Sequence, residues 1–396
     1  MYNYLVRIYI IDQMVEVYMH KKEYRVQTSV YFPVHGGEWN GEKSDIHIDL
    51  SVNTNPLGMP ENVKKLFEDG SMSLLAERFP DRECTALRHA LAEEYLVPSE
   101  NIICGNGASE LIMTAVSAFK ACGLKRALIA VPSFSGYERS LKAYGIETVY
   151  HELKREDGFI LTDSFTDTLS ENIRKMKSKG DLAVFLCNPN NPNGACIEKT
   201  LLEKTVTLCE ENGVWLFLDE CFIGFTGAGS DRSLKILTQD HKYLCVLDAF
   251  TKLYALPGLR IGFIFSGNDM LNENMRMLLP EWNVSALAQA AGMAALTDNK
   301  DYLRKTVDLT ERERRFLEDK LKALGFEVYP GVVNFIMFRT SENDKFMGLQ
   351  EKLMSKGVLI RSCENFHGTD DRDYRIAVRG HEENLRFIKI LEELAG

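Results

Sequence analysis

The sequence lacks the cysteine patterns of metal sites and disulfide frameworks. Its nine cysteines form no C-x-x-C pair and no cluster with histidine at metal-ligand spacing, and their number is odd. This pattern is typical of a reducing compartment, where most thiols act as small core hydrophobes. We therefore expect a cytoplasmic protein that holds no metal.

Long apolar runs and an excess of basic charge are also missing. Arg7, Asp12 and Glu16 interrupt the mildly apolar N-terminus before it reaches the length of a signal segment or a membrane span. The 57 acidic and 47 basic residues are interspersed and give a net charge of −10, which argues against nucleic acid or a membrane as partner. A chain of 396 residues, 45% of them hydrophobic, is long enough for two or three cores.

Short apolar runs recur between longer stretches of helical character. Continuous apolar strands separated by helices indicate a parallel sheet that helices cover on both faces. The predicted fold class is therefore α/β, with a mostly parallel central sheet. The runs that carry this prediction are residues 126–131, 181–187, 214–219, 243–250 and 260–265.

The pattern changes towards the C-terminus. Residues 285–298 and 300–323 predict two helices, and after Gly325 two short strands flank a turn at Pro330 and Gly331. A helix, a strand, a loop, a strand and a last helix follow, which indicates a smaller α+β unit. The predicted division is an N-terminal extension (1–34), a segment that contributes to the small domain and the active site (35–74), a large domain (75–280) and a C-terminal small domain (281–396).

Residues 104–112, CGNGASELI, place two glycines and a serine where an apolar strand gives way to a helix. Small residues let backbone amides approach an anion, and the helix dipole adds a favourable potential. A phosphate could therefore bind at Gly107, Ala108 and Ser109. The motif is weak by itself, because glycine-rich turns are common and it matches neither G-x-G-x-x-G nor the P-loop.

Two further loops follow apolar strands. CNPNNPNG (187–194) combines asparagines, prolines and a glycine, and by itself indicates only a turn. FLDECFIGF (217–225) places Asp219 and Glu220 at the end of a hydrophobic strand. Acids at the carboxyl end of a strand face the crevice where α/β proteins bind ligands, although a helix N-cap is the structural alternative.

The stretch FTKLYALPGLRIGF (250–263) carries Lys252 on an apolar run and Arg260 eight residues later. A lysine among desolvating neighbours has a lowered pKa and can form a Schiff base, whereas a lysine in isolation is more often a surface residue with a buried stem. The order of the motifs favours the functional interpretation, because an anion site, an asparagine loop, an acid, a lysine and an arginine follow successive strands. Together they describe a site for a phosphorylated aldehyde with a cationic ring.

From about His35 to the C-terminus, these motifs resemble the fold type I, aspartate-aminotransferase-like enzymes of the aminotransferase class I/II superfamily. The resemblance implies that pyridoxal 5'-phosphate binds Lys252 through its aldehyde and that Asp219 pairs with its ring nitrogen. It also implies that Asn191 bonds the phenolic oxygen, that Phe134 stacks on the ring, and that the protein is a homodimer. The residues expected around the cofactor phosphate are Gly107, Ala108, Ser109, Thr251 and Arg260.

Two branches of this superfamily resemble the chain. The histidinol-phosphate aminotransferases share its NPLG head, its asparagine loop and two C-terminal arginines. The threonine-phosphate decarboxylases of cobalamin biosynthesis share these features and also resemble the chain in the segments 35–37, 49–60, 281–288 and 359–378. We therefore favour decarboxylation of a small phosphorylated amino acid to an amino-alcohol phosphate, with an aminotransferase of the histidinol-phosphate type as the alternative.

A phosphorylated amino acid carries a phosphate and a carboxylate, and arginine binds both groups through paired hydrogen bonds. By the resemblance, Arg375 holds the α-carboxylate and Arg361 meets the distal phosphate. If the resemblance is set aside, the simpler interpretation is that these arginines form surface ion pairs with nearby acids. Those acids are Glu364, Asp370, Asp371 and Asp373. The other residues that the resemblance places at the substrate are His35, Gly36, Asn53 and Asn191.

Four positions depart from the superfamily pattern. RFPD has Phe79 in place of a tyrosine that reaches the cofactor phosphate across the dimer interface. Asn193 replaces a threonine and Cys221 replaces an alanine of the superfamily pattern. Phe222 lacks the hydroxyl that the aminotransferases carry at that position. The decarboxylases share this phenylalanine. We expect these changes to affect the substrate and the efficiency more than the choice of cofactor.

Decarboxylation and transamination differ in which bond at the substrate Cα breaks, and Lys252 is the expected proton carrier at that carbon in both. The orientation that Arg361 and Arg375 impose on the substrate would decide between them. A non-catalytic relative that binds a regulatory ligand is a third alternative. The presence of Lys252, Asp219 and Arg260 together argues against it.

Overall fold

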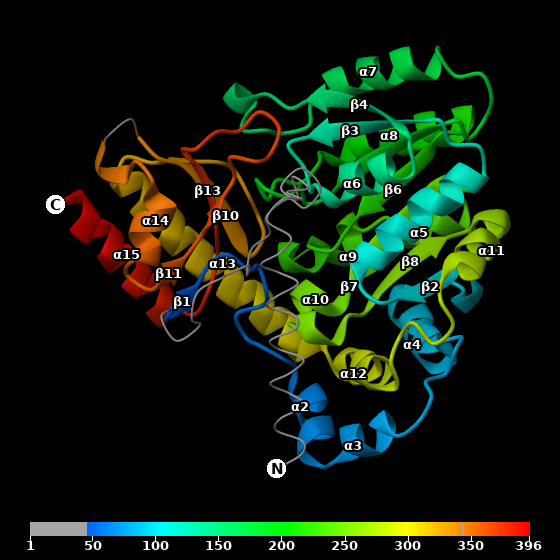
Figure 1. Ribbon diagram of the computed structural model, residues 1–396, viewed down its shortest axis with the longest axis horizontal. Helices are drawn as coiled ribbons and strands as arrows, with labels where there is room; N and C mark the ends of the chain where they lie inside the picture. Colours follow the sequence, from blue (N-terminus) through cyan, green and yellow to red (C-terminus); the bar gives the residue numbers. More distant parts are fainter. Residues whose placement is uncertain (1–45, 228, 342–343) are drawn as a thin grey trace, which may run out of the picture. The chain divides into compact units, whose positions relative to one another are not determined.

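The computed structural model describes residues 46–227, 229–341 and 344–396 (Figure 1). The chain divides into two units, residues 1–35 and 36–396, and the description below concerns the second. The predicted N-terminal extension lies outside the described residues, as do His35 and Gly36.

A seven-stranded sheet forms the centre of the large domain, in the order β2-β8-β7-β6-β5-β3-β4 (Figure 1). Neighbouring strands from β7 to β4 pair in parallel, whereas β8 is antiparallel to both of its neighbours. The predicted α/β class with a mostly parallel sheet is therefore confirmed. The strands are β2 Ile102–Gly105, β3 Arg126–Val131, β4 Glu147–Glu152, β5 Leu182–Cys187, β6 Trp215–Asp219, β7 Leu244–Ala249 and β8 Gly262–Ser266.

All five predicted apolar runs form strands. Every residue of β5, β6, β7 and β8 is buried, as expected for strands covered on both faces. The last run was predicted from residue 260, but β8 begins at Gly262, because Arg260 has φ 55° in the left-handed region and cannot extend the strand.

Helices surround this sheet. They are α2 Glu61–Glu68, α3 Ser71–Ala76, α4 Thr85–Tyr95, α5 Ala108–Ala121, α6 Gly136–Ala143, α7 Ser164–Ile173, α8 Lys199–Asn212, α9 Gly229–Arg232, α10 Phe250–Leu253, α11 Asp269–Leu278 and α12 Ala286–Leu296. Because β5, β6 and β7 are parallel neighbours, their carboxyl ends meet at one edge of the sheet. This edge brings together the asparagine loop, Asp219 and the short helix that carries Lys252.

The smaller α+β unit is also present. A four-stranded sheet in the order β12-β13-β10-β9 and a parallel pair β1-β11 share a second hydrophobic cluster with the helices α13 and α15. The elements are β1 Ile48–Asp49, α13 Lys300–Ala323, β9 Glu327–Val328, β10 Phe335–Arg339, α14 Leu349–Met354, β11 Val358–Leu359, β12 Arg361–Ser362, β13 Asp373–Ala377 and α15 His381–Ala395.

The predicted four-part division of the chain stays a prediction, although the two hydrophobic clusters show where its segments pack. Ile48 and Leu50 belong to the small-domain cluster, and Ile48 pairs with Val358. Ala288 and Ala291 of α12 belong to the large-domain cluster. Segments far apart in the sequence therefore complete each core.

Candidate active site

Lys252 lies on α10, a single turn that follows directly after β7. The N-terminal segment holds this turn in place: Asn55 donates its backbone N–H to the carbonyl of Lys252 at 3.0 Å. The Asn55 side-chain nitrogen donates to the carbonyl of Leu253 and to the Thr306 hydroxyl, both at 2.7 Å. The sequence interpretation missed Asn55, because nothing in NTNPLG distinguishes its role from that of Asn53.

The environment of Lys252 favours the neutral amine. Loss of hydration lowers its pKa to about 8, and repulsion by Arg375, and less by Arg260 and Arg379, adds to the effect. About one amine in ten is then neutral at pH 7, against well under one in a thousand at the ordinary pKa of lysine. The lowered pKa that was predicted for this residue has the expected cause, burial, and a second cause in the arginines around it.

Asp219 is the last residue of β6, and two donors hold its buried carboxylate. Tyr137 donates its hydroxyl to Oδ2 at 2.6 Å, and the backbone N–H of Cys221 donates to Oδ1 at 3.0 Å. Burial nevertheless raises the pKa of Asp219. A carboxylate in this position is stabilised by a cationic partner such as a protonated ring nitrogen. Tyr137 was missed, although it lies in the same PSFSGY stretch as Phe134.

The residues of the predicted anion site lie where the N-terminus of α5 meets Arg260. Gly107 precedes the helix with φ 85°, and Ala108 is its first residue. A Cβ atom at Gly107 would lie 2.6 Å from Arg260 Nη2, so only glycine leaves room for the guanidinium. Arg260 also donates to the carbonyl of Pro257 at 3.2 Å. Free amides and a guanidinium thus converge at one helix end, as a phosphate site requires.

Ser109 is the second residue of α5 and is exposed, whereas Thr251 is the second residue of α10 and is half-buried. Phe134 precedes α6, and its ring packs edge-on against Tyr137 with centroids 5.6 Å apart. A Cβ atom at Gly136 would lie 2.3 Å from that ring, so glycine is required beside it. Their roles towards a cofactor stay predictions.

The two predicted substrate arginines lie opposite each other on neighbouring strands. Arg361 of β12 and Arg375 of β13 are register partners and are 8% and 7% exposed. Burial lowers the pKa of Arg375 to about 10, and repulsion by Arg361 contributes. Like charges that face each other across a ladder are destabilising. The pair therefore gains stability when an anion binds between or beside the two guanidinium groups.

Arg375 has contacts that orient it towards the sheet edge. It donates to Asn191 Oδ1 at 2.5 Å and to the carbonyl of Ser51 at 3.3 Å, and its Cζ lies 5.4 Å from the centroid of the Phe335 ring. Its buried Nε has no hydrogen-bond partner among the described residues. The structure thus places the predicted residues Asn191 and Arg375 together and leaves the Arg375 Nε–H without a partner among the described residues.

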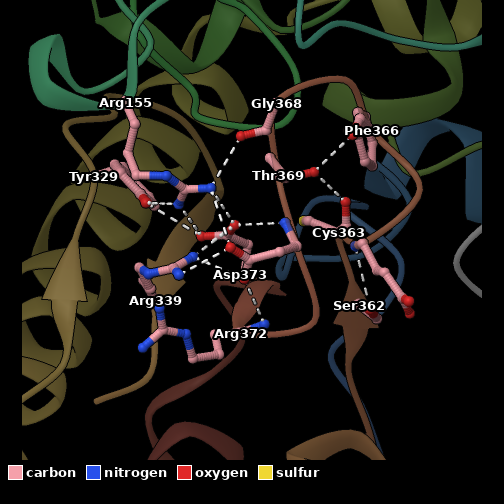
Figure 2. Close-up of polar contacts among 12 residues, drawn as sticks. Arg155, Tyr329, Arg339, Ser362, Cys363, Phe366, Gly368, Thr369, Arg372 and Asp373 are labelled. Atoms are coloured by element: carbon pink, nitrogen blue, oxygen red, sulfur yellow. Dashed lines mark hydrogen bonds and ion pairs between the residues drawn. The ribbon is translucent and has the colours of Figure 1, made fainter. Parts of the chain in front are cut away.

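Two of the four acids near Arg361 and Arg375 in the sequence form ion pairs with other arginines. Asp370 and Asp373 pair instead with Arg155 and Arg339 (Figure 2). Their carboxylates are therefore engaged by arginines outside the predicted site.

Asn53 is buried, and its side-chain oxygen has no hydrogen-bond partner within the described part of the chain. Arg379, which was not predicted, fixes the segment around it. Its guanidinium donates to the carbonyls of Asp49 and Val52 and to the Thr54 hydroxyl, at 2.7 to 3.1 Å. The only sequence signal for Arg379 was its place directly after the strand YRIAV.

The departures from the superfamily pattern have structural explanations in two cases. Asn193 is fully buried, and its side-chain nitrogen donates to the carbonyls of Gly158 and Phe159 at 3.1 and 2.8 Å, so it joins two loops. Phe222 packs edge-on against Phe335 at 5.0 Å and gives the site an apolar wall. No structural reason for Cys221 emerges beyond its backbone bond to Asp219.

Glu220 has a structural role behind the site. Its buried carboxylate binds Lys235 Nζ at 2.9 Å, and Lys235 also binds Asp248 at 3.0 Å. Attraction to these two carboxylates keeps the pKa of Lys235 raised despite burial. This buried network joins the ends of β6 and β7, on which Asp219 and Lys252 depend.

Residues 45–390 match the sequence profile of the aminotransferase class I and II family. The chain belongs to this family. The chain is 36% identical over 356 residues to the threonine-phosphate decarboxylase of Salmonella typhimurium, and the match covers 89% of this chain and 93% of that protein. It is 30% identical over 353 residues to the histidinol-phosphate aminotransferase of Methanosarcina mazei, covering 89% of each.

The solved structure of the histidinol-phosphate aminotransferase from Clostridium acetobutylicum matches this chain with a TM-score of 0.78 and 28% sequence identity. The match covers 88% of this chain and 99% of that one. The predicted superfamily and the aspartate-aminotransferase-like fold are therefore confirmed.

Proposed function

We propose that this chain decarboxylates a small phosphorylated amino acid of the threonine-phosphate type with pyridoxal 5'-phosphate as cofactor. The observation that carries the proposal is the buried pair Arg361 and Arg375, which suits a substrate with two anionic groups. The 36% identity to a threonine-phosphate decarboxylase over most of both chains supports the same substrate class.

The residues present fit the cofactor. The glycine that makes room for Arg260 at the start of α5 suits its phosphate, the buried carboxylate of Asp219 suits its ring nitrogen, and the amine of Lys252 has the lowered pKa that attack on an aldehyde requires. When bound, pyridoxal 5'-phosphate withdraws electrons from the Cα of an attached amino acid, so that a bond at that carbon breaks more easily.

In this proposal, the protein contributes orientation and proton transfer. Arg375 binds the α-carboxylate, and Arg361 binds the distal phosphate together with Asn53. Holding both anions would fix which bond at Cα is presented for cleavage. Lys252, in its ammonium form once the substrate amine has taken its place, would donate to Cα the proton that replaces the departing carbon dioxide.

The assay that tests this function offers threonine phosphate and serine phosphate to the cofactor-loaded protein. Release of carbon dioxide and an amino-alcohol phosphate is expected. Activity that appears only with 2-oxoglutarate as amino acceptor would instead establish the aminotransferase alternative, which the Methanosarcina mazei relative favours. Absence of any spectral change on adding pyridoxal 5'-phosphate would establish a non-catalytic relative.

Borohydride reduction tests the site itself. It is expected to fix the cofactor on Lys252, which peptide mapping would locate. A label on any other lysine would contradict the assignment.

The proposal includes a homodimer. Phe79, expected at the dimer interface, is 82% exposed and packs against Trp282, which is 45% exposed, with ring centroids 5.1 Å apart. Met277 is exposed as well. Light scattering should give twice the chain mass, and Trp282→Glu should lower it.

The cytoplasm stays the proposed location. All nine cysteines are free thiols. No helix in the described ranges is long and apolar enough to span a membrane.

A further inference from the structure

Residues 363–372, the β12–β13 loop, carry the contacts that orient Arg361. Asn365 accepts a hydrogen bond from Arg361 Nη2 at 2.7 Å, and the Phe366 ring lies 5.6 Å from its Cζ. The next two residues of the loop, His367 and Gly368, contact the large domain. The place of the Arg361 guanidinium therefore depends on how the large domain holds this loop.

Arg155 provides the strongest of these contacts (Figure 2). It begins the short 3-10 helix Arg155–Asp157 after β4. Its Nη2 donates to the carbonyl of Gly368 at 2.9 Å, and its two terminal nitrogens bind the two oxygens of Asp373 at 2.8 and 2.9 Å. Asp373 is fully buried and begins β13, two residues before Arg375. One arginine of the large domain thus fixes both the loop beside Arg361 and the strand of Arg375.

A second contact holds the loop further along. His367 Nε2 lies 3.2 Å from Glu138 Oε2 on α6, and the His367 ring packs on Tyr150 with centroids 4.6 Å apart. Tyr150 donates its hydroxyl to Glu138 Oε1 at 2.7 Å. The loop is therefore attached to the large domain at two consecutive residues.

Arg339 offers a natural comparison with Arg155. It binds the same Asp373 at 3.0 Å and Asp370 at 2.8 and 2.9 Å. Arg339 lies on β10, directly opposite Asp373 on the neighbouring strand β13. This ion pair stays within the small domain. Loss of either arginine leaves Asp373 with the other as its cationic partner, so the two variants differ mainly in whether Gly368 and Asp373 keep their bonds to the large domain.

We propose that Arg155 is a positioning residue: by joining Gly368 and Asp373 to the large domain, it holds the β12–β13 loop, and through the loop Arg361, where the distal phosphate of the substrate binds. This inference rests on the proposed function, because it takes Arg361 to meet that phosphate. Arg155 then contributes to specificity for phosphorylated substrates without touching them.

The test compares Arg155→Gln with Arg339→Gln in the cofactor-loaded protein. Arg155→Gln should raise KM for threonine phosphate roughly tenfold or more and lower kcat by a smaller factor, because displacement of Arg361 weakens binding of the distal phosphate while Arg375 still holds the carboxylate. Arg339→Gln should leave KM within about threefold of wild type. The absorbance of the bound cofactor should be unchanged in both.

Amide hydrogen exchange gives an independent readout. Exchange in residues 365–368, the part of the loop beside Arg361, should become faster in Arg155→Gln and stay closer to wild type in Arg339→Gln. Because Arg339 binds Asp370, Arg339→Gln should speed exchange mainly around residues 370–372. If Arg155→Gln does not fold, Arg155→Lys replaces it, since lysine keeps the charge but cannot bind Gly368 and both oxygens of Asp373 at once.

Two results would overturn the proposal. Equal increases in KM in both variants would indicate a general loss of stability, and faster exchange without a change in KM would show that the loop does not place Arg361. The proposed function fails separately, if wild type releases no carbon dioxide from any phosphorylated amino acid. In that case the affinity for inorganic phosphate, measured by calorimetry, replaces KM as the readout. Arg155→Gln should lower this affinity more than Arg339→Gln does, and equal affinities in the two variants would again overturn the proposal.

Discussion

The hydrogen bond from Tyr137 to Asp219 should determine how well the protein binds its cofactor. Tyr137→Phe removes only the hydroxyl that donates to Asp219 at 2.6 Å, within a fully buried environment. A hydrogen bond to a charged group contributes about 1.5 to 3 kcal/mol. Because the bond is present before the cofactor binds, only the part of this energy that keeps Asp219 ionised affects affinity, and its loss should weaken binding of pyridoxal 5'-phosphate by up to about 10-fold at neutral pH.

The pH dependence should show the cause. Burial already raises the pKa of Asp219, and the bond from Tyr137 opposes that shift. Without the hydroxyl the pKa rises further, so ionisation of the carboxylate requires a higher pH. The curve of cofactor affinity against pH should therefore move to higher pH in the variant, and the difference from wild type should shrink as pH rises.

The assay is a titration of cofactor-free protein with pyridoxal 5'-phosphate, followed by absorbance at several pH values. Tyr150→Phe is the matched control, because it removes a hydroxyl that donates to Glu138 at 2.7 Å, a carboxylate outside the cofactor site. Tyr137→Phe with the affinity and pH profile of Tyr150→Phe would refute the reasoning.

Three further predictions concern the same site. Asp219→Asn removes a buried carboxylate with a raised pKa, whose destabilising charge is absent at low pH and appears as pH rises through that pKa. The cofactor-free variant should therefore unfold at the same or a higher temperature than wild type at neutral pH, and this difference should disappear in acid. Cofactor binding should weaken more than about tenfold. A variant less stable at neutral pH would contradict this. The rate of cofactor capture should rise with pH to a plateau with a midpoint near the Lys252 pKa of about 8, and stopped-flow absorbance that places it near 10 would exclude the proposed environment. Asn193→Ala should lower the free energy of unfolding by about 1 to 3 kcal/mol, because it leaves the buried carbonyl of Phe159 and the half-buried carbonyl of Gly158 without their donor. Urea denaturation with an unchanged midpoint would show that water replaces the donor.

The sequence was informative where function follows from the ends of strands. Apolar runs predicted β5, β6 and β7, and parallel pairing then places the residues after each run on one edge. Asp219 and Lys252 could be found in this way, because their positions depend on local pattern and on a general rule of topology. Gly107 and Arg260 could be found by motif, although their direct contact could not.

The sequence was silent where a role depends on the register between distant segments. Asn55 was indistinguishable from Asn53, and Tyr137 from any other tyrosine near a turn. The acids near Arg361 suggested surface ion pairs, and only the structure shows that Asp373 binds Arg155, which lies 218 residues earlier in the chain.

The sequence by itself therefore determined the fold class, because strand periodicity is a local property, and its motifs identified the superfamily and its cofactor through their resemblance to known enzymes. The tertiary structure alone decided that Arg361 faces Arg375 and that Arg155 holds the loop beside them. The physical reason is that the first contact depends on the register between two strands and the second on the packing of two domains, and neither is set by any one stretch of the chain.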